Sequence, residues 1–291
     1  MFIEPFANNE FLRFSLVAGI LVAITCAIAG TFVVLRGLAF IGDALAHGVL
    51  PGIATAMLLG VSGVIGAAIS SLVMMAGVSI VSRRFRLSGD TAIGLLFVGM
   101  LALGVMITSQ SRSFVGDLSR ILFGELLGVN TRDLILQLVA LVIVGAVAFV
   151  ARRPFLLLCV DEGLAKTSGF SSRLFHNLML MIVTITVIAS FQTVGTLLVL
   201  GMLIAPAATG ALFARRISIM IFIASLVGSV STYVGLLVSY HFDLAAGASI
   251  VLTAVLIFAV AATYTEIKKT ITDNGHNEHE HPHTHAGSHI R

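Results

Sequence analysis

Long stretches without a single Asp, Glu, Lys or Arg dominate this chain and limit what it can fold into. The hydrocarbon core of a bilayer takes roughly 20 helical residues. Five such stretches have the length of one crossing: 14–35, 91–111, 134–151, 217–242 and 244–265. Only 11% of the 291 residues are charged and 58% are hydrophobic, which excludes a soluble domain with a polar surface. The chain is therefore predicted to be an all-α integral membrane protein.

Two further stretches are too long for a single crossing. Residues 174–214 must hold two helices, with the turn expected at 191–193, and residues 38–82 are broken between Gly60 and Gly63. The sequence predicts about nine crossings, at approximately 14–35, 38–59, 63–82, 91–110, 134–151, 174–191, 194–213, 217–240 and 245–265. The alternative is eight crossings, with 38–82 as one tilted or broken element.

The positions of the basic residues predict the orientation. With the N-terminus outside, thirteen of the 17 Lys and Arg residues lie on the cytoplasmic side and four lie outside, as the positive-inside rule expects. The formal charge of +3 is too small to favour nucleic acid as a partner. The sequence thus predicts a multi-pass protein of a plasma membrane, with the N-terminus outside and the C-terminus in the cytoplasm.

The domain boundaries follow from this topology. Residues 1–13 are expected to form an external interfacial segment, and residues 14–269 the transmembrane domain. Residues 112–133 mix apolar and charged side chains, which predicts a short amphipathic helix on the outer surface. It would rest in the lipid headgroups or dock a partner. Two cysteines, Cys26 and Cys159, lie in or beside apolar sequence and indicate no disulfide framework.

One acid lies inside a predicted crossing, at Asp43, with His47 four positions later. Such an acid costs about 2.5–3.5 kcal/mol on insertion scales and usually faces an aqueous path or a paired charge. Residues four apart leave one face of a helix, and a carboxylate with an imidazole suits Zn, Mn or Fe. Pro51 is expected to kink the helix and free the carbonyl of His47, while Gly48 and Gly52 allow another helix to approach closely. The alternative is that Asp43 and His47 only hydrogen-bond within the bundle.

A second polar group, His241 with Asp243, ends the eighth predicted crossing on the outer side. These two residues could receive an ion at an external mouth, or they could belong to an ordinary solvated loop, because polar residues at the interface cost little.

The last residues, 270–291, differ from the rest in composition and lack apolar periodicity, which predicts a disordered cytoplasmic tail. Its imidazoles would bind Zn, Ni or Cu with moderate affinity in a regulatory or buffering role, or the tail is dispensable. The candidate ligands here are His276, His279, His281, His283, His285 and His289.

Residues 35–52 closely resemble the permease subunits of bacterial ABC importers for zinc, manganese and iron. The usual form in that family is Gly-Asp-Ala-x-Ser-His-x-x-Leu-Pro-Gly, and here Ala46 replaces the Ser. Residues 194–209 resemble the family's seventh-helix signature, and residues 239–243 resemble its outer Ser-Tyr-x-x-Asp element. Residues 161–170 resemble its cytoplasmic coupling helix.

The resemblance implies the ABC importer permease fold of the metal-chelate type, in a homodimer that encloses a path at its interface. It implies two copies of a separate ATPase, docked through the cytoplasmic coupling region 155–173, and an extracytoplasmic metal-binding protein. Asp43 and His47 would then form the transit site. The chain has no G-x-x-x-x-G-K-[ST] run, so it is expected to be a transport subunit and no enzyme. It would bind no cofactor, and a divalent metal, Zn, Mn or Fe, would be its substrate.

Two other function classes remain at this point. A proton-coupled metal transporter or exporter would be expected to carry more than one acid in its crossings, where Asp43 is the only carboxylate deep within one. A membrane metal sensor would use its histidine-rich tail to read cytoplasmic metal. For the importer, the imidazoles favour zinc over manganese and iron, and the resemblance places it in a bacterial plasma (inner) membrane.

Overall fold

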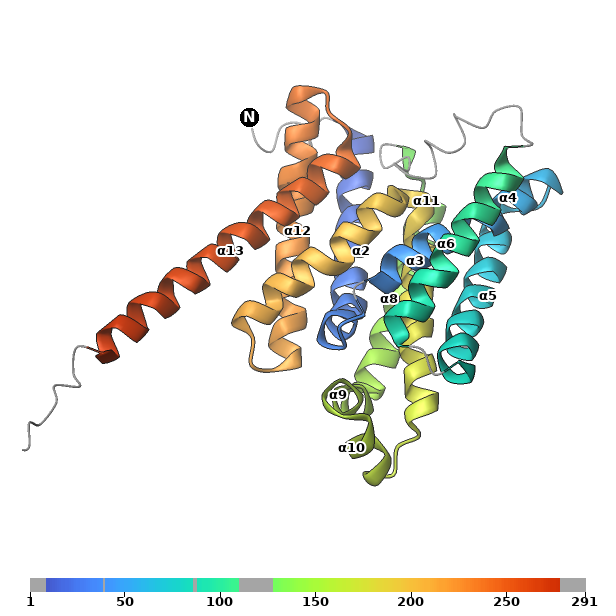
Figure 1. Cartoon of the computed structure of the whole chain (residues 1–291). Coiled ribbons are helices and arrows are strands. Elements are labelled where there is room, and N and C mark those ends of the chain that lie inside the picture. Colours follow the sequence, from blue (N-terminus) through green and yellow to red (C-terminus); the bar gives the residue numbers. More distant parts are fainter. Residues whose placement is uncertain (1–8, 39, 86–87, 110–127, 278–291) are drawn as a thin grey trace, which may run out of the picture.

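The computed structural model describes residues 9–38, 40–85, 88–109 and 128–277, and the regular elements in these ranges are all helices (Figure 1). In chain order they are α2 (Glu10–Leu35), α3 (Phe40–Gly48), α4 (Leu50–Leu58), α5 (Gly63–Arg84), α6 (Gly89–Thr108), α8 (Thr131–Val150), α9 (Arg152–Val160), α10 (Glu162–Thr167), α11 (Ser172–Phe213), α12 (Ile217–Phe242) and α13 (Ala246–Asn277).

Within the described ranges, eight helices are long and apolar enough to cross a membrane. A ninth, Leu198–Phe213, is apolar but shorter, so each predicted crossing has a helix and the seventh is the shortest. Residues 40–58 and 63–82 form separate spans, which rules out the alternative of one broken element across 38–82. Gly60 lies in the connection with a φ of 68°, a backbone conformation that glycine adopts without strain.

The sixth and seventh crossings are the two arms of α11. The turn lies at Gly195, where φ is 78° and ψ is 161°, and not at 191–193 as the sequence predicted. Figure 1 shows one arm descending from this bend towards α10 and the other towards the start of α12. Residues with a side chain avoid this backbone region almost completely, which explains why the bend falls on the glycine.

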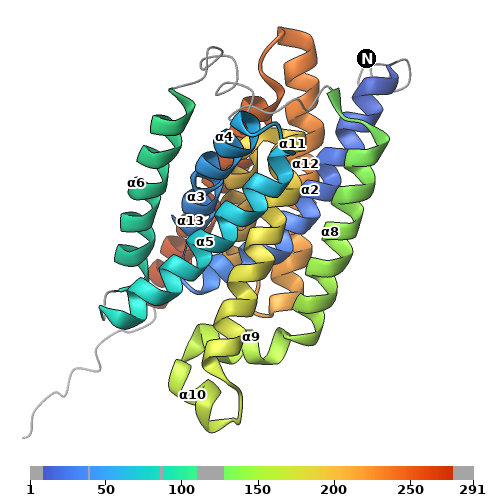
Figure 2. The same cartoon turned by 90° about the vertical axis from the view of Figure 1, so that its right-hand side faces the viewer.

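Helix α2 lies between α12 and α8 in Figure 1, can be followed from the side in Figure 2, and packs against α8, α11 and α12. Gly30 lies so close to the carbonyl oxygen of Leu203 that a side chain there would collide with the backbone of α11. On the same helix, the ring of Phe32 meets Phe155 of α9 edge to face, 5.0 Å between centroids. The first crossing is thus a core element of the fold.

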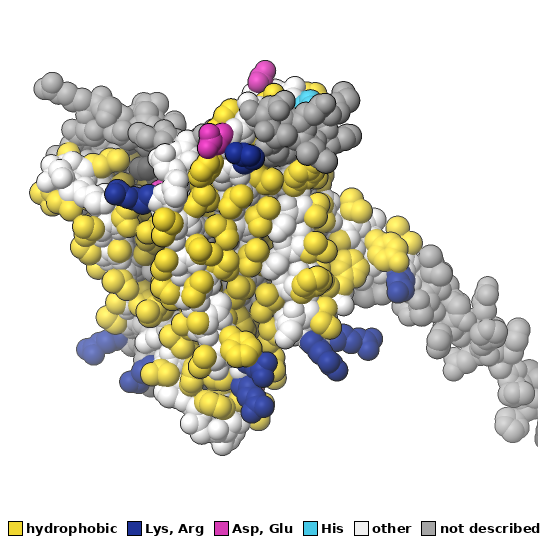
Figure 3. Space-filling model, turned by 180° about the vertical axis from the view of Figure 1, so that it is seen from behind, with side chains coloured by type: hydrophobic (Ala, Val, Ile, Leu, Met, Phe, Trp, Pro, Cys, Tyr) yellow, Lys and Arg dark blue, Asp and Glu magenta, His cyan; other side chains and the backbone are white. Residues whose placement is uncertain are grey.

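The surface has an apolar belt and one basic end. Figure 3 shows hydrophobic side chains over the middle of the molecule, and more Lys and Arg side chains towards the end from which α9 and α10 project than at the opposite end. Arg36, Arg84 and Arg216 flank helices at this end. The predicted coupling region 155–173 falls in α9, α10 and the start of α11, at the same end.

Three predicted segments differ from the structure or lie outside it. Helix α2 already begins at Glu10, and residues 1–8 of the interfacial segment lie outside the described residues. Most of the predicted amphipathic helix, namely residues 112–127 of 112–133, lies outside them too. The prediction of a disordered tail from residue 270 was wrong for 270–277, because α13 continues to Asn277. The end of an apolar stretch indicates where the chain leaves the bilayer, but it does not indicate where the helix ends. A helix that has already formed can continue into polar sequence, because each further residue adds one hydrogen bond.

Candidate metal-transit site

Asp43 and His47 lie together on α3, as their spacing predicted. The distance between Oδ1 of Asp43 and Nε2 of His47 is 3.3 Å. The two side chains are 32% and 25% exposed, respectively, so neither is sealed in the core. Both residues belong to the span Phe40–Leu58, where α3 lies at mid-height of the bundle in Figure 1. The pair is therefore a polar group at membrane depth that an ion could reach.

Apolar packing holds α3 in place around the pair. Ala44 and Ala46 are buried between the two polar residues, against a bundle that includes α5, α6 and α11. Gly42, just before Asp43, meets the side chain of Leu203 on the second arm of α11. The ring of Phe97 on α6 contacts the His47 ring edge to face, with 5.4 Å between centroids. The imidazole is thus positioned by an aromatic neighbour that the motif did not predict.

The geometry of the pair fits two ligands of one metal ion. In a tetrahedral site with ligands about 2.0–2.2 Å from the metal, two ligand atoms lie about 3.4 Å apart. The observed 3.3 Å fits this spacing and also a long hydrogen bond between the two side chains. Nδ1 of His47 is buried and has no hydrogen-bond partner among the described residues. The tautomer of this imidazole is therefore not fixed by a hydrogen bond at Nδ1.

The end of α3 has the predicted break. The helix is interrupted at Val49, and Pro51 lies in the first turn of α4, where its missing N–H does no harm. The carbonyl oxygen of Gly48 accepts a hydrogen bond of 2.6 Å from the hydroxyl of Ser70 on α5. Because Gly52 meets the backbone of Gly66 without a side chain between them, α4 and α5 pack closely, as the glycine spacing predicted.

The outer candidates His241 and Asp243 are exposed and lie at the end of α12. Nδ1 of His241 is 2.9 Å from the carbonyl oxygen of Leu237, one turn back in the helix. Asp243 ends the helix in the left-handed conformation, with φ at 51°. Helix α12 packs against α2, α11 and α13, while α3 packs against α4, α5, α6 and α11. The two candidate groups therefore belong to different parts of the bundle.

Of the six tail histidines, only His276 belongs to the described residues. His276 belongs to the last turn of α13, and the other five, His279, His281, His283, His285 and His289, lie outside the described residues. Among the described residues, no three His, Cys, Asp or Glu side chains gather in a way that could hold a metal ion. Within the described part of one chain, Asp43 and His47 are thus an incomplete ligand set.

Two polar groups escaped the sequence analysis. Gln137 on α8 is fully buried; it donates to the Thr25 hydroxyl at 3.2 Å and accepts from Ser190 at 3.4 Å, which links three helices. As the only amide in the stretch 134–151, Gln137 could have been noticed. The second group surrounds His176, which lies in the first turns of α11 and lines a large cavity at the basic end. No motif joins the residues of that cavity.

Comparison with known proteins gives a consistent result. The family model described as the ABC 3 transport family matches residues 8–265. The manganese transport system membrane protein MntC of Listeria innocua is 36% identical over 261 residues, which covers 90% of this chain and 93% of that protein. The chelated iron transport system membrane protein YfeD of Yersinia pestis is 36% identical over 265 residues, covering 91% and 89%.

Solved structures agree with these relatives. The structure of PsaBC from Streptococcus pneumoniae in complex with Fab contains a chain that is 35% identical and superimposes with a TM-score of 0.80, covering 89% of this chain and 94% of that one. A structure described as an inward-facing metal-chelate type ABC transporter shares the fold, with a TM-score of 0.74 at 16% identity. The chain therefore belongs to the ABC 3 transport family and is a membrane-spanning permease subunit of a metal ABC transporter, a transport subunit and not an enzyme.

Proposed function

We propose that this permease carries a divalent transition metal ion into the cell, driven by ATP hydrolysis on a partner chain, and that Asp43 and His47 form its transit site. The observation that carries the proposal is the 3.3 Å separation of a carboxylate oxygen and an imidazole nitrogen, partly exposed at membrane depth. Ionisable residues inside a membrane are costly, so their presence indicates a function. The family and the names of the relatives support metal as the cargo.

An incomplete ligand set suits transit better than storage. Two protein ligands leave the remaining positions to water or to the same pair from a second copy of the chain. An ion held in this way can leave quickly, because no closed cage must open. A site with four protein ligands would bind more tightly and release more slowly.

The transported metal could be manganese, iron or zinc. A carboxylate with an imidazole accepts Mn, Fe or Zn, so the pair does not discriminate among them. The expectation of zinc rests on the histidine-rich tail and the His47 imidazole, whereas the relatives are named for manganese and chelated iron. We place manganese and iron first and keep zinc as the third metal to test. In all three cases the metal is cargo, and no resident cofactor is proposed.

We propose that different partner proteins bind at the two ends of the molecule. We place the basic end in the cytoplasm of a bacterium, with the N-terminus outside the plasma (inner) membrane and the C-terminus inside. The region 155–173, which projects from this end in Figure 1, would contact one of two ATPase copies. An extracytoplasmic metal-binding protein would dock at the opposite end, near His241 and Asp243. A second copy of the chain would complete the path within the bilayer.

The outer residues and the tail have secondary roles in this proposal. His241 has only Nε2 left for an ion, because Nδ1 faces the Leu237 carbonyl oxygen, so a contribution to ion entry would be small. The tail histidines would bind zinc moderately and modulate transport. A chain truncated after Thr272 is expected to transport metal at the wild-type rate under metal limitation; loss of transport would contradict an accessory role for the tail.

The proposal is tested by rescue of a bacterial strain that lacks its own metal importers, expressing this chain with its ATPase and binding protein. Growth limited separately by Mn, Fe and Zn identifies the metal that the wild type restores. Asp43→Asn and His47→Ala should abolish that rescue while the protein remains in the membrane at wild-type amounts. Asp90→Asn removes an exposed acid at the start of α6 and serves as the control. Rescue at the wild-type level by both site variants would contradict the transit role.

A further inference from the structure

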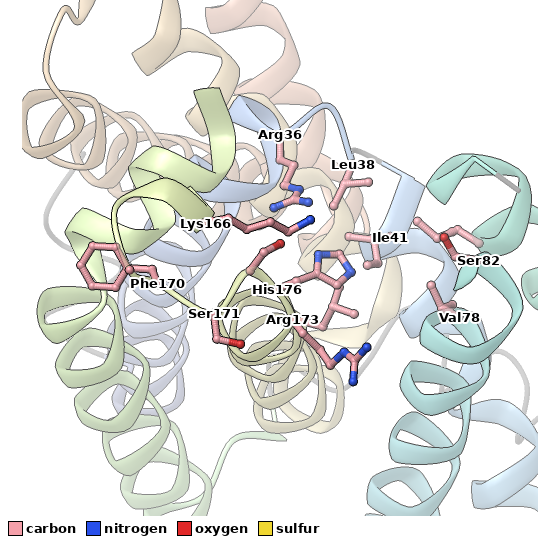
Figure 4. A pocket seen from close by; sticks show the side chains of 14 residues that line it. Arg36, Leu38, Ile41, Val78, Ser82, Lys166, Phe170, Ser171, Arg173 and His176 are labelled. Carbon is pink, nitrogen blue, oxygen red and sulfur yellow. The ribbon is translucent and has the colours of Figure 1, made fainter. Parts of the chain in front are cut away.

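A large cavity opens at the basic end of the molecule, apart from the Asp43–His47 pair. Its volume is about 860 Å³. Its walls come from the start of α3, the end of α5, the segment after α10 and the first turns of α11. Figure 4 shows Ile41 and Leu38 on one side and Phe170 and Ser171 on the other. The cavity is large enough for a phosphate group with part of the molecule that bears it.

The lining of this cavity is cationic. Arg36, Lys166 and Arg173 contribute positive charges and His176 adds an imidazole, and no described Asp or Glu side chain is among the lining residues. In Figure 4 the guanidinium of Arg36 and the ammonium of Lys166 point into the same space, beside the ring of His176. Arg36 also donates to the carbonyl oxygen of Leu158 at 3.5 Å, which anchors its side chain at the cavity wall.

The backbone adds to this positive potential. Ser171 and Ser172, at the N-terminal end of α11, line the cavity. The Ser171 side chain caps the helix by accepting from the N–H of Leu174 at 3.4 Å. The N-terminus of a helix carries a partial positive charge, and its free N–H groups favour an anion. Side chains from three separate segments and a helix terminus thus all favour a negatively charged ligand.

We propose that this cavity binds a phosphate group, as inorganic phosphate or as the headgroup of an anionic phospholipid. Positively charged side chains that lie close together repel each other. An anion bound between them attracts each of them and so offsets this repulsion. Arginine suits the geometry of phosphate because its planar guanidinium donates two parallel hydrogen bonds, and lysine adds a compact charge. The inference concerns a site beyond the metal path and does not depend on the identity of the cargo.

The cavity lies between α3 and the region around α10, so a bound ligand would contact both. Ile41 is two residues before Asp43 on α3, while Lys166 and Arg173 belong to the projecting region at the basic end. A bound phosphate would therefore connect the helix that carries the candidate transit site to the region proposed to contact the ATPase. It should stabilise the arrangement of α3, α10 and α11, because a ligand that binds only the folded state raises the free energy of unfolding.

The test measures the thermal unfolding of the purified full-length chain by circular dichroism. In lipid-free detergent, potassium phosphate is compared with potassium chloride at equal ionic strength. In nanodiscs without free phosphate, phosphatidylglycerol is compared with phosphatidylcholine. We expect phosphate or phosphatidylglycerol to raise the Tm of the wild type by at least about 2 °C. A rise with phosphate alone identifies the free anion as the ligand, and a rise with phosphatidylglycerol alone identifies the lipid headgroup.

Matched variants assign any rise to the cavity. Lys166→Gln combined with Arg173→Gln should lose at least half of the shift, whereas Arg215→Gln combined with Arg216→Gln, which removes two charges at the same end outside the cavity, should keep it. Ser82→Asp adds an acid to the cavity without removing a basic side chain and should also weaken the response, which covers the case that the double variant folds poorly. No shift in the wild type with either probe, or equal shifts in the lining and control variants, would overturn the proposal.

Discussion

Cys159 illustrates how the position of one side chain in the fold sets its chemistry. It lies on α9 outside the membrane spans, partly covered, with its Sγ 3.9 Å from the carbonyl oxygen of Phe32. Burial raises the pKa of the Cys159 thiol, and the neighbouring charge of Arg36 offsets part of this rise. The thiol is therefore expected to be a weaker nucleophile at neutral pH than an ordinary cysteine, because the thiolate is the reactive form.

This expectation is tested by alkylation of Cys159 with iodoacetamide in a Cys26→Ala background, followed by mass spectrometry. The rate should be low at pH 7 and should still increase above pH 9, since the raised pKa moves thiolate formation to higher pH. Arg36→Gln should slow the reaction further at a given pH, because it removes the charge that favours the thiolate, while Arg36→Lys should not. A faster reaction in Arg36→Gln would contradict the assigned cause.

Among single residues, the candidate site was the most predictable part. Asp43 and His47 are four positions apart, and helix geometry alone brings such residues to one face. The edge contact of Phe97 with His47 comes from another helix about 50 positions away, and no local pattern encodes it. The network of Thr25, Gln137 and Ser190 was missed for the same reason.

At the scale of helices, charge-free length predicted the crossings and most of their ends, and the largest difference is α13, which continues to Asn277. The break before Pro51 was predictable because the missing N–H acts locally. The bend in α11 was placed a few residues too early, because composition alone does not say which residue in an apolar stretch of 41 residues will reverse the chain. Gly195, the one glycine near the centre of this stretch, was the signal that could have located the bend.

A substitution at this bend tests the account of α11. Gly195→Ala should destabilise the protein by about 1–3 kcal/mol, because a side chain strains the backbone at a φ of 78° and a ψ of 161°. The measurement is the Tm by circular dichroism in detergent. Gly99→Ala on α6 is the matched control, since its added methyl group meets open space in a helix. Equal Tm values for the two variants would show that the bend does not require glycine.

At the scale of the whole molecule, the charges distinguish the two ends. The sequence predicted one basic side, and Figure 3 shows more basic side chains towards one end than towards the other. The cavity at that end could not be predicted. Arg36 and Lys166 are 130 positions apart, and only the packing of α2, α3, α10 and α11 brings them together. Local patterns predicted the helices and the pair on α3, whereas sites assembled from distant segments required the tertiary structure.

The orientation has a direct test with single cysteines in a chain that carries Cys26→Ala and Cys159→Ala. Glu10→Cys, at the start of α2, should react with a membrane-impermeant maleimide added to intact cells. Lys268→Cys, near the end of α13, should react only after the membrane is permeabilised. This result follows from an odd number of crossings with the basic end inside. Labelling of both positions in intact cells would require an even number.

We propose that Asp43 and His47 carry the transported metal. The most direct test is ATP-dependent uptake of radioactive manganese, and in parallel iron and zinc, by proteoliposomes that contain the complete complex with its ATPase and binding protein. We expect Asp43→Asn to lower the initial uptake rate to background and Asp90→Asn to keep the wild-type rate, while both complexes hydrolyse ATP. Wild-type uptake of every metal by an Asp43→Asn, His47→Ala double variant would contradict it.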